Sequence, residues 1–310
     1  MPTNFPEVWS DRFIQNLTEA SVAPWLDGIP ELSANVQVVN AGSITEKNVI
    51  NVAATDFDVD VLINNTAYPI AVQAYDDETL TFNLDKYQTK VTSINDDDTL
   101  GASYDKIDVI TKSHKRGILE AKYQKAIHSL APATNTAATP VIVATGGPDG
   151  LKDGTRFRLA YEDLVASKEA TKGFKGEKRL VLTETHFNDL LLDRKNFGDK
   201  LVNYNEGTTA PKIAGFKIYQ YDGDMPIFTG ALAKKAYGAI LEAGDREASV
   251  IFTDTAVAKK TGITKQYFAP AATNPAGQTN DLAYRHYFLA VPFRAEKIAA
   301  VISGTYVAAP

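Results

Sequence analysis

The first 44 residues change from a helix-like to an irregular pattern of apolar positions. The apolar residues at the start recur every three or four positions: Phe5, Trp9, Phe13, Leu17 and Ala20. This spacing predicts a short amphipathic helix, with Pro6 tolerated in its first turn. Residues 22–45 are interrupted by Pro and Gly and hold one strand-like piece, NVQVV. Because so long an extended start is hard to fold back on itself, we expect residues 1–44 to form an arm that lies on another surface.

From residue 45 to residue 95 apolar positions alternate with polar ones, as in a β-strand with one buried face. One apolar set is Phe57, Val59, Val61 and Ile63, and the second, after NNTAYP, is Leu80, Phe82 and Leu84. The pattern predicts two antiparallel strands of an extended β-hairpin with one face exposed to water. A two-stranded ribbon is marginal alone, so we expect it to need a partner surface.

The next predicted element is one long helix that follows an acidic run. Three consecutive aspartates, residues 96–98, precede apolar residues at helical spacing. A helix from Thr99 to Ala131 would be about 50 Å long at about 1.5 Å per residue. Gly117 lies inside it at a cost of about 1 kcal/mol relative to alanine, which indicates either a bend or a close contact.

The small, polar stretch of residues 131–140 predicts a domain boundary, and a mixed α/β domain follows it. The expected strands are VIVAT (141–145), RLVLT (179–183), GFKIYQY (215–221) and SVIFT (249–253). The expected helices are one capped by Thr155 with Phe157, Ala160, Tyr161 and Leu164 inward, then HFNDLLL (186–192) and DTAVAKKTG (254–262). Beyond a loop at residues 269–281 we expect two final strands, residues 284–293 and 296–303.

Composition excludes several classes of protein. The 310 residues, 44% hydrophobic, suffice for one large or two medium domains with a sizeable core. The absence of cysteine excludes disulfides, thiolate metal sites, cysteine nucleophiles and iron–sulfur clusters. A net charge of −6 without a strong basic field argues against a sequence-specific DNA reader. No charged leader and no membrane-length apolar window is present, so we expect use in a cytosol-like compartment.

The aspartate run invites a calcium-loop interpretation. Counted from Asp96, the template places Leu100 and Ile107 at ligand positions, and neither side chain can bind calcium. Aspartates at a helix start instead accept hydrogen bonds from free N–H groups and complement the helix dipole. We therefore favour a helix cap at Asp98 or Thr99, and leave a solvated acidic turn and a metal site as alternatives.

Other candidate chemistry is sparse. The Gly-rich TGGPDGLKDGT (145–155) lacks the Gly-Lys-Ser/Thr of a phosphate loop and is best interpreted as a turn. The histidines are scattered and lack metal-ligand spacing, so we interpret them as packing or surface residues: His114, His128, His186 and His286. The basic cluster KSHKRG (112–117) favours a solvated helix face over a phosphate contact. We predict no catalytic, cofactor-binding or metal-binding residue.

The ordered set of elements resembles the major capsid proteins of tailed bacteriophages, whose fold is named after phage Hong Kong 97. The resemblance begins with FPEVWSDRFIQNL as an arm helix, the ribbon of residues 45–95 as an extended loop, and residues 96–131 as a spine helix. It continues through residues 178–200, 213–228 and 248–263 to the closing strands. The implied HK97-like α+β fold has these parts: N-terminal arm 1–44, extended β-hairpin loop 45–95, spine helix and peripheral domain 96–139, axial domain 140–280 and return strands 281–310.

The resemblance implies a structural protein, not an enzyme, that assembles as pentamers and hexamers into an icosahedral shell around double-stranded DNA. Its implied partners are copies of itself, a portal, separate scaffolding and decoration proteins, and packaged DNA held non-specifically; no membrane or cofactor is implied. Its place would be the virion, and the host cytoplasm during assembly. We expect no scaffolding segment ahead of the arm.

Some family members link subunits through a lysine–asparagine isopeptide bond assisted by a glutamate. Lys86 and Lys90 lie on the ribbon as such a lysine would, but no asparagine or glutamate aligns, so we predict no cross-link. Two alternatives stay open. One is an encapsulin-like compartment protein of the same fold that encloses an enzyme cargo, and the other is a soluble α/β enzyme, such as a hydrolase, in residues 141–268 around His186.

Overall fold

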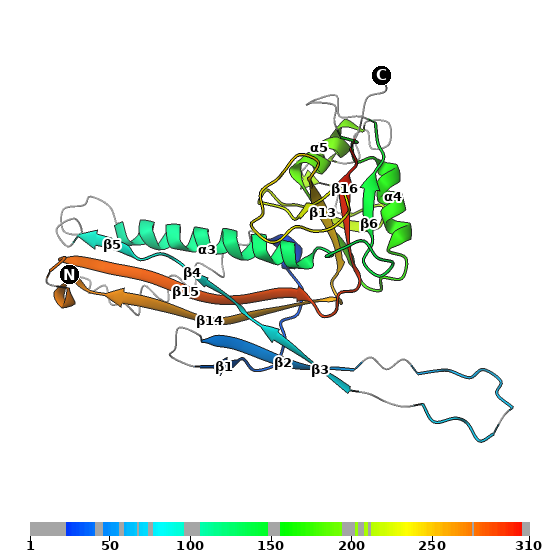
Figure 1. Ribbon diagram of the computed structural model, residues 1–310, viewed down its shortest axis with the longest axis horizontal. Coiled ribbons are helices and arrows are strands. Elements are labelled where there is room, and N and C mark those ends of the chain that lie inside the picture. The colour runs from blue at the N-terminus through cyan, green and yellow to red at the C-terminus, as the bar shows by residue number, and fades with distance from the viewer. Residues whose placement is uncertain are drawn as a thin grey trace.

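The molecule consists of a long platform, a globular α/β body at one end of it, and a projecting β-ribbon (Figure 1). The computed structural model describes residues 23–40, 46–55, 59–66, 68–73, 77–95, 106–147, 156–193, 202–203, 208–209, 212–274 and 276–305. The predicted helix at residues 5–20, the aspartates 96–98 with their predicted cap at Asp98 or Thr99, and Thr155 lie outside the described residues.

The platform is a four-stranded sheet covered by one helix. Its elements are β4 (Asp85–Gln88), β5 (Thr92–Asn95), β14 (Val257–Ala269), β15 (Thr279–Pro292) and α3 (Lys106–Leu130). All strand pairs in it are antiparallel, and β15 is the central strand, with β14 on one side and β4 and β5 on the other. Ile118 of α3 packs on Leu282 and Tyr284 of β15, which explains the unbroken burial of the middle of that strand.

The α/β body is built on a seven-stranded mixed sheet. Its strands are β6 (Val141–Ala144), β7 (Lys178–Leu182), β10 (Lys212–Ile213), β11 (Phe216–Gln220), β12 (Ile227–Phe228), β13 (Arg246–Thr253) and β16 (Ile298–Ser303). Helices α4 (Tyr161–Ala170) and α5 (Glu184–Leu192) belong to the same body. The central strands are apolar on both faces because each face has its own core. On β7, Leu180 and Leu182 share a cluster with Leu164 of α4 and Leu190 of α5, whereas Val181 belongs to the opposite cluster.

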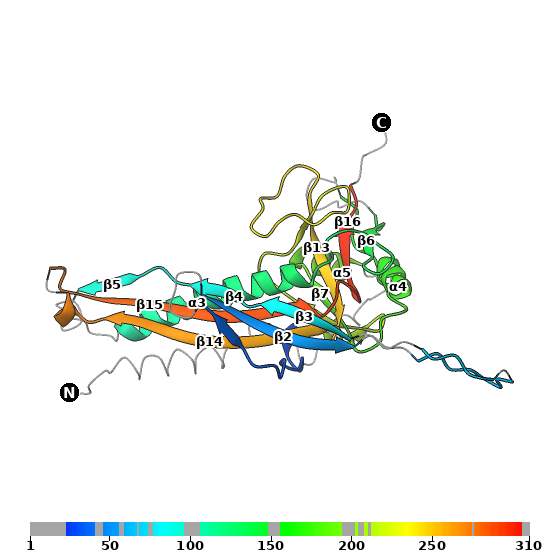
Figure 2. The same cartoon turned by 60° about the horizontal axis from the view of Figure 1, so that its bottom comes forward.

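The ribbon is a three-stranded antiparallel sheet next to the platform (Figure 2). It consists of β1 (Gln37–Val39), β2 (Lys47–Thr55) and β3 (Asp77–Asn83). The short remaining elements are η1 (Pro24–Leu26), β8 (Val202–Asn203), β9 (Thr208–Thr209) and η3 (Ala271–Thr273). Ile50, Phe82 and Leu84 pack with Tyr287 and Leu289 of β15, so the base of the ribbon shares a core with the platform.

Residues 23–32 form part of the core at the junction of platform and body. Trp25 is fully buried, with edge contacts to Tyr123 of α3, Tyr221 and Phe252 at ring-centroid distances of 6.4, 5.8 and 6.3 Å. Its carbonyl oxygen accepts a hydrogen bond of 2.9 Å from Nη1 of Arg179. The expectation that residues 22–45 lie away from the chain's own core is therefore wrong for this segment. The prolines and the glycine obscure the apolar pattern in the sequence. Five apolar residues of the segment are nevertheless buried: Ala23, Trp25, Leu26, Ile29 and Leu32.

Most expected elements of the second half are confirmed, and three assignments along the chain are corrected. The segments predicted as β6, β7, α5, β11, β13, β15 and β16 all form as expected. Residues 254–262 do not form a helix: from Val257 they belong to β14, because pairing along β15 outweighs the helix propensity of Ala and Lys. Residues 59–63 lie outside any strand, and the hairpin pairs Lys47–Thr55 with Asp77–Asn83 instead. The helix predicted from Phe157 begins only at Tyr161.

We expect Trp25→Ala to lower the free energy of unfolding by about 3–5 kcal/mol, because the cavity would lie where three elements meet. Urea denaturation followed by circular dichroism measures this change. Tyr68→Ala serves as control, since the Tyr68 side chain is 77% exposed and its loss should change stability by less than about 0.5 kcal/mol. Equal small effects in both variants would contradict a core position for Trp25.

Two glycines should respond to alanine in opposite directions. A Cβ at Gly117 would meet nothing within 4 Å in α3, so Gly117→Ala should stabilise the chain by about 1 kcal/mol. A Cβ at Gly262 would lie 2.7 Å from Cβ of Tyr287 and 2.8 Å from Cδ2 of Leu84, and that overpacking should cost about 1–3 kcal/mol. Urea midpoints of the two variants that shift in the same direction would contradict this placement.

Candidate interaction surfaces

The loop between β2 and β3 carries a run of exposed apolar side chains. We call residues 59–66 and 68–73 the excursion; it points away from the rest of the molecule (Figures 1 and 2). The following side chains are 55% to 96% exposed: Val59, Val61, Leu62, Ile63, Tyr68, Ile70 and Val72. Scattered exposed apolar residues are normal in proteins, but seven of them on one projecting loop make it a candidate interaction surface. Full burial of each aliphatic member would contribute about 1.5–3 kcal/mol.

The base of the ribbon, in contrast, is fixed to the platform by a buried ion pair. Glu46 precedes β2, and its Oε1 lies 3.2 Å from Nη2 of Arg285 in β15. The hydroxyl of Tyr287 donates to the same oxygen at 3.2 Å, and the Lys265 ammonium lies 3.9 Å from it. A carboxylate held by two cations and a phenol resists displacement, because breaking the group would leave a buried charge unpaired. The excursion therefore starts from a fixed base.

A buried cluster in the α/β body contains the side chains that a hydrolase would use. His186, at the start of α5, lies with Nδ1 2.7 Å from Oγ of Ser249 and Nε2 3.1 Å from Oγ of Ser303. Arg156 makes a two-pronged ion pair with Asp189, at 2.6 and 2.8 Å, and its Nη1 also donates to Oγ of Ser303 at 3.3 Å.

The environment of this cluster is that of a structural network. His186, Ser249 and Ser303 are all buried, so no substrate reaches the hydroxyl groups. Burial lowers the pKa of His186 to about 4, so the ring is neutral and bonded at both nitrogens. The two serines come from β13 and β16 and the histidine from α5, and the hydrogen bonds therefore join this helix to the centre of the sheet.

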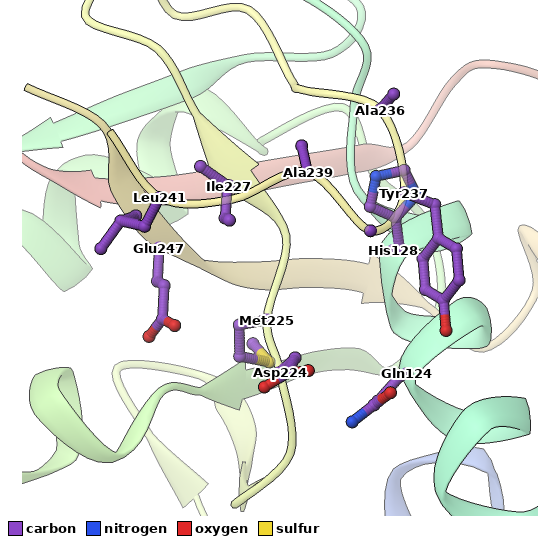
Figure 3. Close-up of a pocket in the computed structure, with 11 residues that line it drawn as sticks. Gln124, His128, Asp224, Met225, Ile227, Ala236, Tyr237, Ala239, Leu241 and Glu247 are labelled. Atoms are coloured by element: carbon purple, nitrogen blue, oxygen red, sulfur yellow. The ribbon is translucent and has the colours of Figure 1, made fainter. Parts of the chain in front are cut away.

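A hollow of about 360 Å³ lies between α3 and the loop of residues 229–244. Figure 3 shows His128 and Tyr237 side by side on one wall and Leu241 and Glu247 on the other. The His128 ring contacts Tyr237 at 5.5 Å, and Nε2 lies 3.0 Å from the carbonyl oxygen of Lys235. The ring thus holds this loop against the helix.

The same loop closes the carboxyl end of α3. Nζ of Lys234 donates to the carbonyl oxygens of His128 at 2.9 Å and Ala131 at 2.6 Å. Carbonyl groups in the last turn of a helix lack intrahelical partners, and a cation there also complements the helix dipole. Burial lowers the pKa of Lys234 to about 8, in keeping with an ammonium placed inside the fold.

The remaining sequence-predicted residues do not come together in a site. The histidines are packing residues with these partners: His114 with Thr92, His128 with Lys235, His186 with Ser249 and Ser303, and His286 with Thr264. Within residues 112–117 only His114 is buried, whereas Lys112 and Arg116 are exposed. Lys86 lies in β4 and Lys90 in the turn after it, both exposed. Among the described residues, no group of three His, Asp or Glu side chains could hold a metal ion.

Two further findings bear on the kind of protein. None of the described helices is long and apolar enough to cross a membrane. A feature missed by the sequence reasoning is a group of four lysines around one hollow of the body, which comes from residues 168, 178, 212 and 217. The lysine-rich stretch KEATKGFKGEKR (168–179) was the available signal, but its partners on the hairpin at residues 212–217 are distant in sequence.

A long helix on a long sheet, a projecting ribbon and an α/β body together form the fold of tailed-phage major capsid proteins. The chain is similar to the capsid protein of cyanophage P-SCSP1u, at 13% identity over 89% of this chain and 91% of that one, with a TM-score of 0.56. It is also similar to the capsid of a native GTA particle, at 10% identity over 92% of this chain and 90% of that one, with a TM-score of 0.59. A virus-like particle from Pyrococcus furiosus matches at 11% identity over 96% of this chain and 100% of that one, with a TM-score of 0.54.

These likenesses are visible in the fold and not in the sequence. No protein-family model matches the chain, and no curated protein sequence matches it. The resemblance found from the order of elements is confirmed by the solved structures, which span nearly the whole chain.

We expect the stability of the chain to fall as the pH drops from about 6.5 toward 5. Burial lowers the pKa of His186 to about 4 and, with nearby Lys122, that of His286 to about 3, from an ordinary 6.5. Between these values the unfolded chain binds protons that the folded chain excludes. Each histidine then lowers the free energy of unfolding by about 1.4 kcal/mol per pH unit. Urea denaturation across this pH range measures the slope.

His186→Gln keeps hydrogen-bonding capacity but removes the titrating group. This variant should be less stable at neutral pH, with a slope reduced by about 1.4 kcal/mol per pH unit. A slope equal to that of the unchanged chain would contradict a buried, neutral His186.

Proposed function

We propose that the chain is the major capsid protein of a tailed phage. It self-assembles as pentamers and hexamers into an icosahedral head shell that encloses double-stranded DNA. The observation that carries this proposal is the match of the fold, over about nine tenths of both chains, to solved capsid proteins. The exposed apolar excursion adds independent support, because nothing in the described part of the chain covers it and an apolar surface of this kind suits a partner.

The geometry suits assembly by exchange of surfaces between copies. Each chain has a platform and an excursion whose apolar side chains are exposed. A neighbouring copy buries the excursion of the first copy. Because the neighbour binds the folded chain and not the unfolded one, assembly also stabilises each subunit. The net charge of −6 suits a container, since a weakly negative wall does not hold packaged DNA fast.

We propose a division of this subunit into two domains that follows the two sheets. The peripheral domain comprises α3 and the four-stranded sheet, and the axial domain comprises the seven-stranded sheet with α4 and α5. This division replaces the expected axial range of 140–280, because β14, from residue 257, pairs within the platform and not within the body. Residues 45–95 supply the extended loop and also β4 and β5 of the platform.

The subunit acts as a structural protein without catalysis or cofactor. The burial of the His186 cluster supports this assignment over a hydrolase in residues 141–268. Its further partners are a portal, separate scaffolding and decoration proteins, and the packaged DNA, which it contacts non-specifically. It resides in the virion, and in the host cytoplasm during assembly. No isopeptide cross-link joins the subunits.

Assembly is tested on the purified full chain by light scattering and negative-stain microscopy, with and without a separate scaffold. We expect closed shells, and nuclease-resistant double-stranded DNA in shells recovered from infected or reconstituted systems. A strictly monomeric chain under all conditions would contradict the proposal. Shells that hold an enzyme cargo and no DNA would indicate the encapsulin-like alternative instead.

The double variant Val61→Asp with Ile63→Asp should fold but fail to assemble, because two charges would have to be buried at the interface. Under conditions in which neither chain assembles, its melting temperature should match that of the unchanged chain, since both side chains are exposed in the monomer. Asn64→Asp with Thr66→Asp adds the same charge at exposed polar positions of the excursion and serves as the matched control. Normal shells from the apolar double variant would exclude the excursion as an assembly contact.

A further inference from the structure

A hollow of about 280 Å³ in the α/β body is surrounded by lysines. It lies where α4 ends, β7 begins and the β10–β11 hairpin turns. Its charged lining residues are Lys168, Lys178, Lys212, Lys217 and Glu177. Four ammonium groups face one carboxylate in a chain whose net charge is −6, so this place differs in sign from the molecule as a whole.

The hairpin places two of these lysines directly opposite each other. Ala214 and Gly215 form its two-residue loop, with φ angles of 50° and 90°. Positive φ at both positions is the geometry of the tight turn that fits twisted antiparallel strands. The resulting register makes Lys212 and Lys217 cross-strand partners. Like charges in this position are destabilising, so folding stability alone does not explain the pair.

The single acid of the hollow does not balance this charge. The Glu177 carboxylate lies 3.6 Å from Nζ of Lys217 but also 3.4 Å from Nε of Arg179. Arg179 is committed to the carbonyl oxygens of Trp25 and Asp27. In the part of the chain that the structure describes, neither Lys168 nor Lys212 has an acidic side chain within ion-pair distance.

The fourth lysine of the hollow, Lys178, is bonded to the residue that ends α4. Nζ of Lys178 donates to the carbonyl oxygen of Thr171 at 2.6 Å and to its Oγ1 at 3.2 Å. Burial, with Lys168 nearby, lowers the pKa of this ammonium. A Cβ at Gly215 would lie 3.6 Å from Cε of Lys168, so the hairpin turn and the α4 lysine approach closely.

We propose that this lysine hollow is a binding site for phosphate groups. Lysine ammonium groups are strong point-charge partners of phosphate, and three of them converge here without a full set of protein anions. The phosphate could be free inorganic phosphate or the phosphodiester backbone of a nucleic acid. The inference goes beyond the proposed function and does not rest on it, because phosphate binding is measured on the full chain whether or not shells form.

The test uses inorganic pyrophosphate by calorimetry and a fluorescent DNA duplex by anisotropy, each at low and moderate salt. The variant is Lys168→Gln, Lys212→Gln and Lys217→Gln together; Lys178 is left unchanged because it caps α4. Loss of three phosphate contacts should weaken the binding of each probe that binds by about tenfold or more and, for the DNA duplex, reduce the slope of log K against log salt by about 0.9 per contact. If both probes bind, the site is assigned to the phosphodiester backbone. If only pyrophosphate binds, the site is assigned to free phosphate.

A matched triple variant, Lys47→Gln, Lys90→Gln and Lys297→Gln, makes the same change in net charge at exposed positions elsewhere. This control variant should change the binding affinity and the salt dependence far less. Equal losses in the two triple variants, or no binding of either probe by the unchanged chain at low salt, would overturn the proposal.

Glu177→Gln provides a test in which binding should become tighter, a result that misfolding would not produce. Removal of Glu177, the one acid among the described residues that line the hollow, should tighten the binding of pyrophosphate by about twofold or more, because it removes a repulsive charge next to Lys217. Melting curves check that each variant is folded. Unchanged or weaker binding by the folded Glu177 variant would also overturn the proposal, even if the triple variant failed to fold.

Discussion

Burial of Trp25 ties together parts of the chain that would otherwise be separate bodies. Its indole contacts α3 of the platform and two aromatic residues of the α/β body, and its backbone accepts from Arg179 of β7. The next carbonyl group, that of Leu26, accepts from Lys259 of β14 at 3.0 Å. The segment thus fills the junction with side chains while its backbone is held from both sheets. Both sheets place residues in the same cluster around it, so this insertion joins the platform to the body.

The elements that sequence analysis predicted well are those whose burial is decided inside the chain. β7, β13 and β16 are apolar on both faces, and α5 has a capping threonine, Thr183, whose Oγ1 accepts from the backbone N–H of His186. In these elements the local sequence pattern agrees with the burial that the folded chain gives each residue. Sequence analysis failed for residues 254–262, since Ala and Lys are good helix formers and only the long pairing with β15 makes them a strand. It also misplaced the hairpin strands, because Val59, Val61 and Ile63 alternate like a strand but are exposed and lie outside the described strand pairs.

The candidate surfaces divide in the same way. That the ribbon needs a partner followed from its alternating pattern, and the exposed excursion agrees with that reasoning. The lysine hollow could not be found by pattern, because its lysines become neighbours only after β10, β11 and β7 align. The His186 cluster shows the opposite risk. Histidine, serines and an aspartate do meet in space, but they are buried and their hydrogen bonds join the sheet to α5.

The capped end of α3 has a mechanical consequence. Lys234 and His128 fix the carboxyl end of the helix to the loop of residues 229–244, while the helix extends along the platform. With 25 residues, α3 is about 37 Å long at about 1.5 Å per residue. A tilt of about 5° at the fixed end therefore moves the distant end by about 3 Å. Because Ile118 packs on Leu282 and Tyr284 of β15, such a tilt would carry the central strand with the helix, and a small adjustment around Lys234 would reach the far end of the platform.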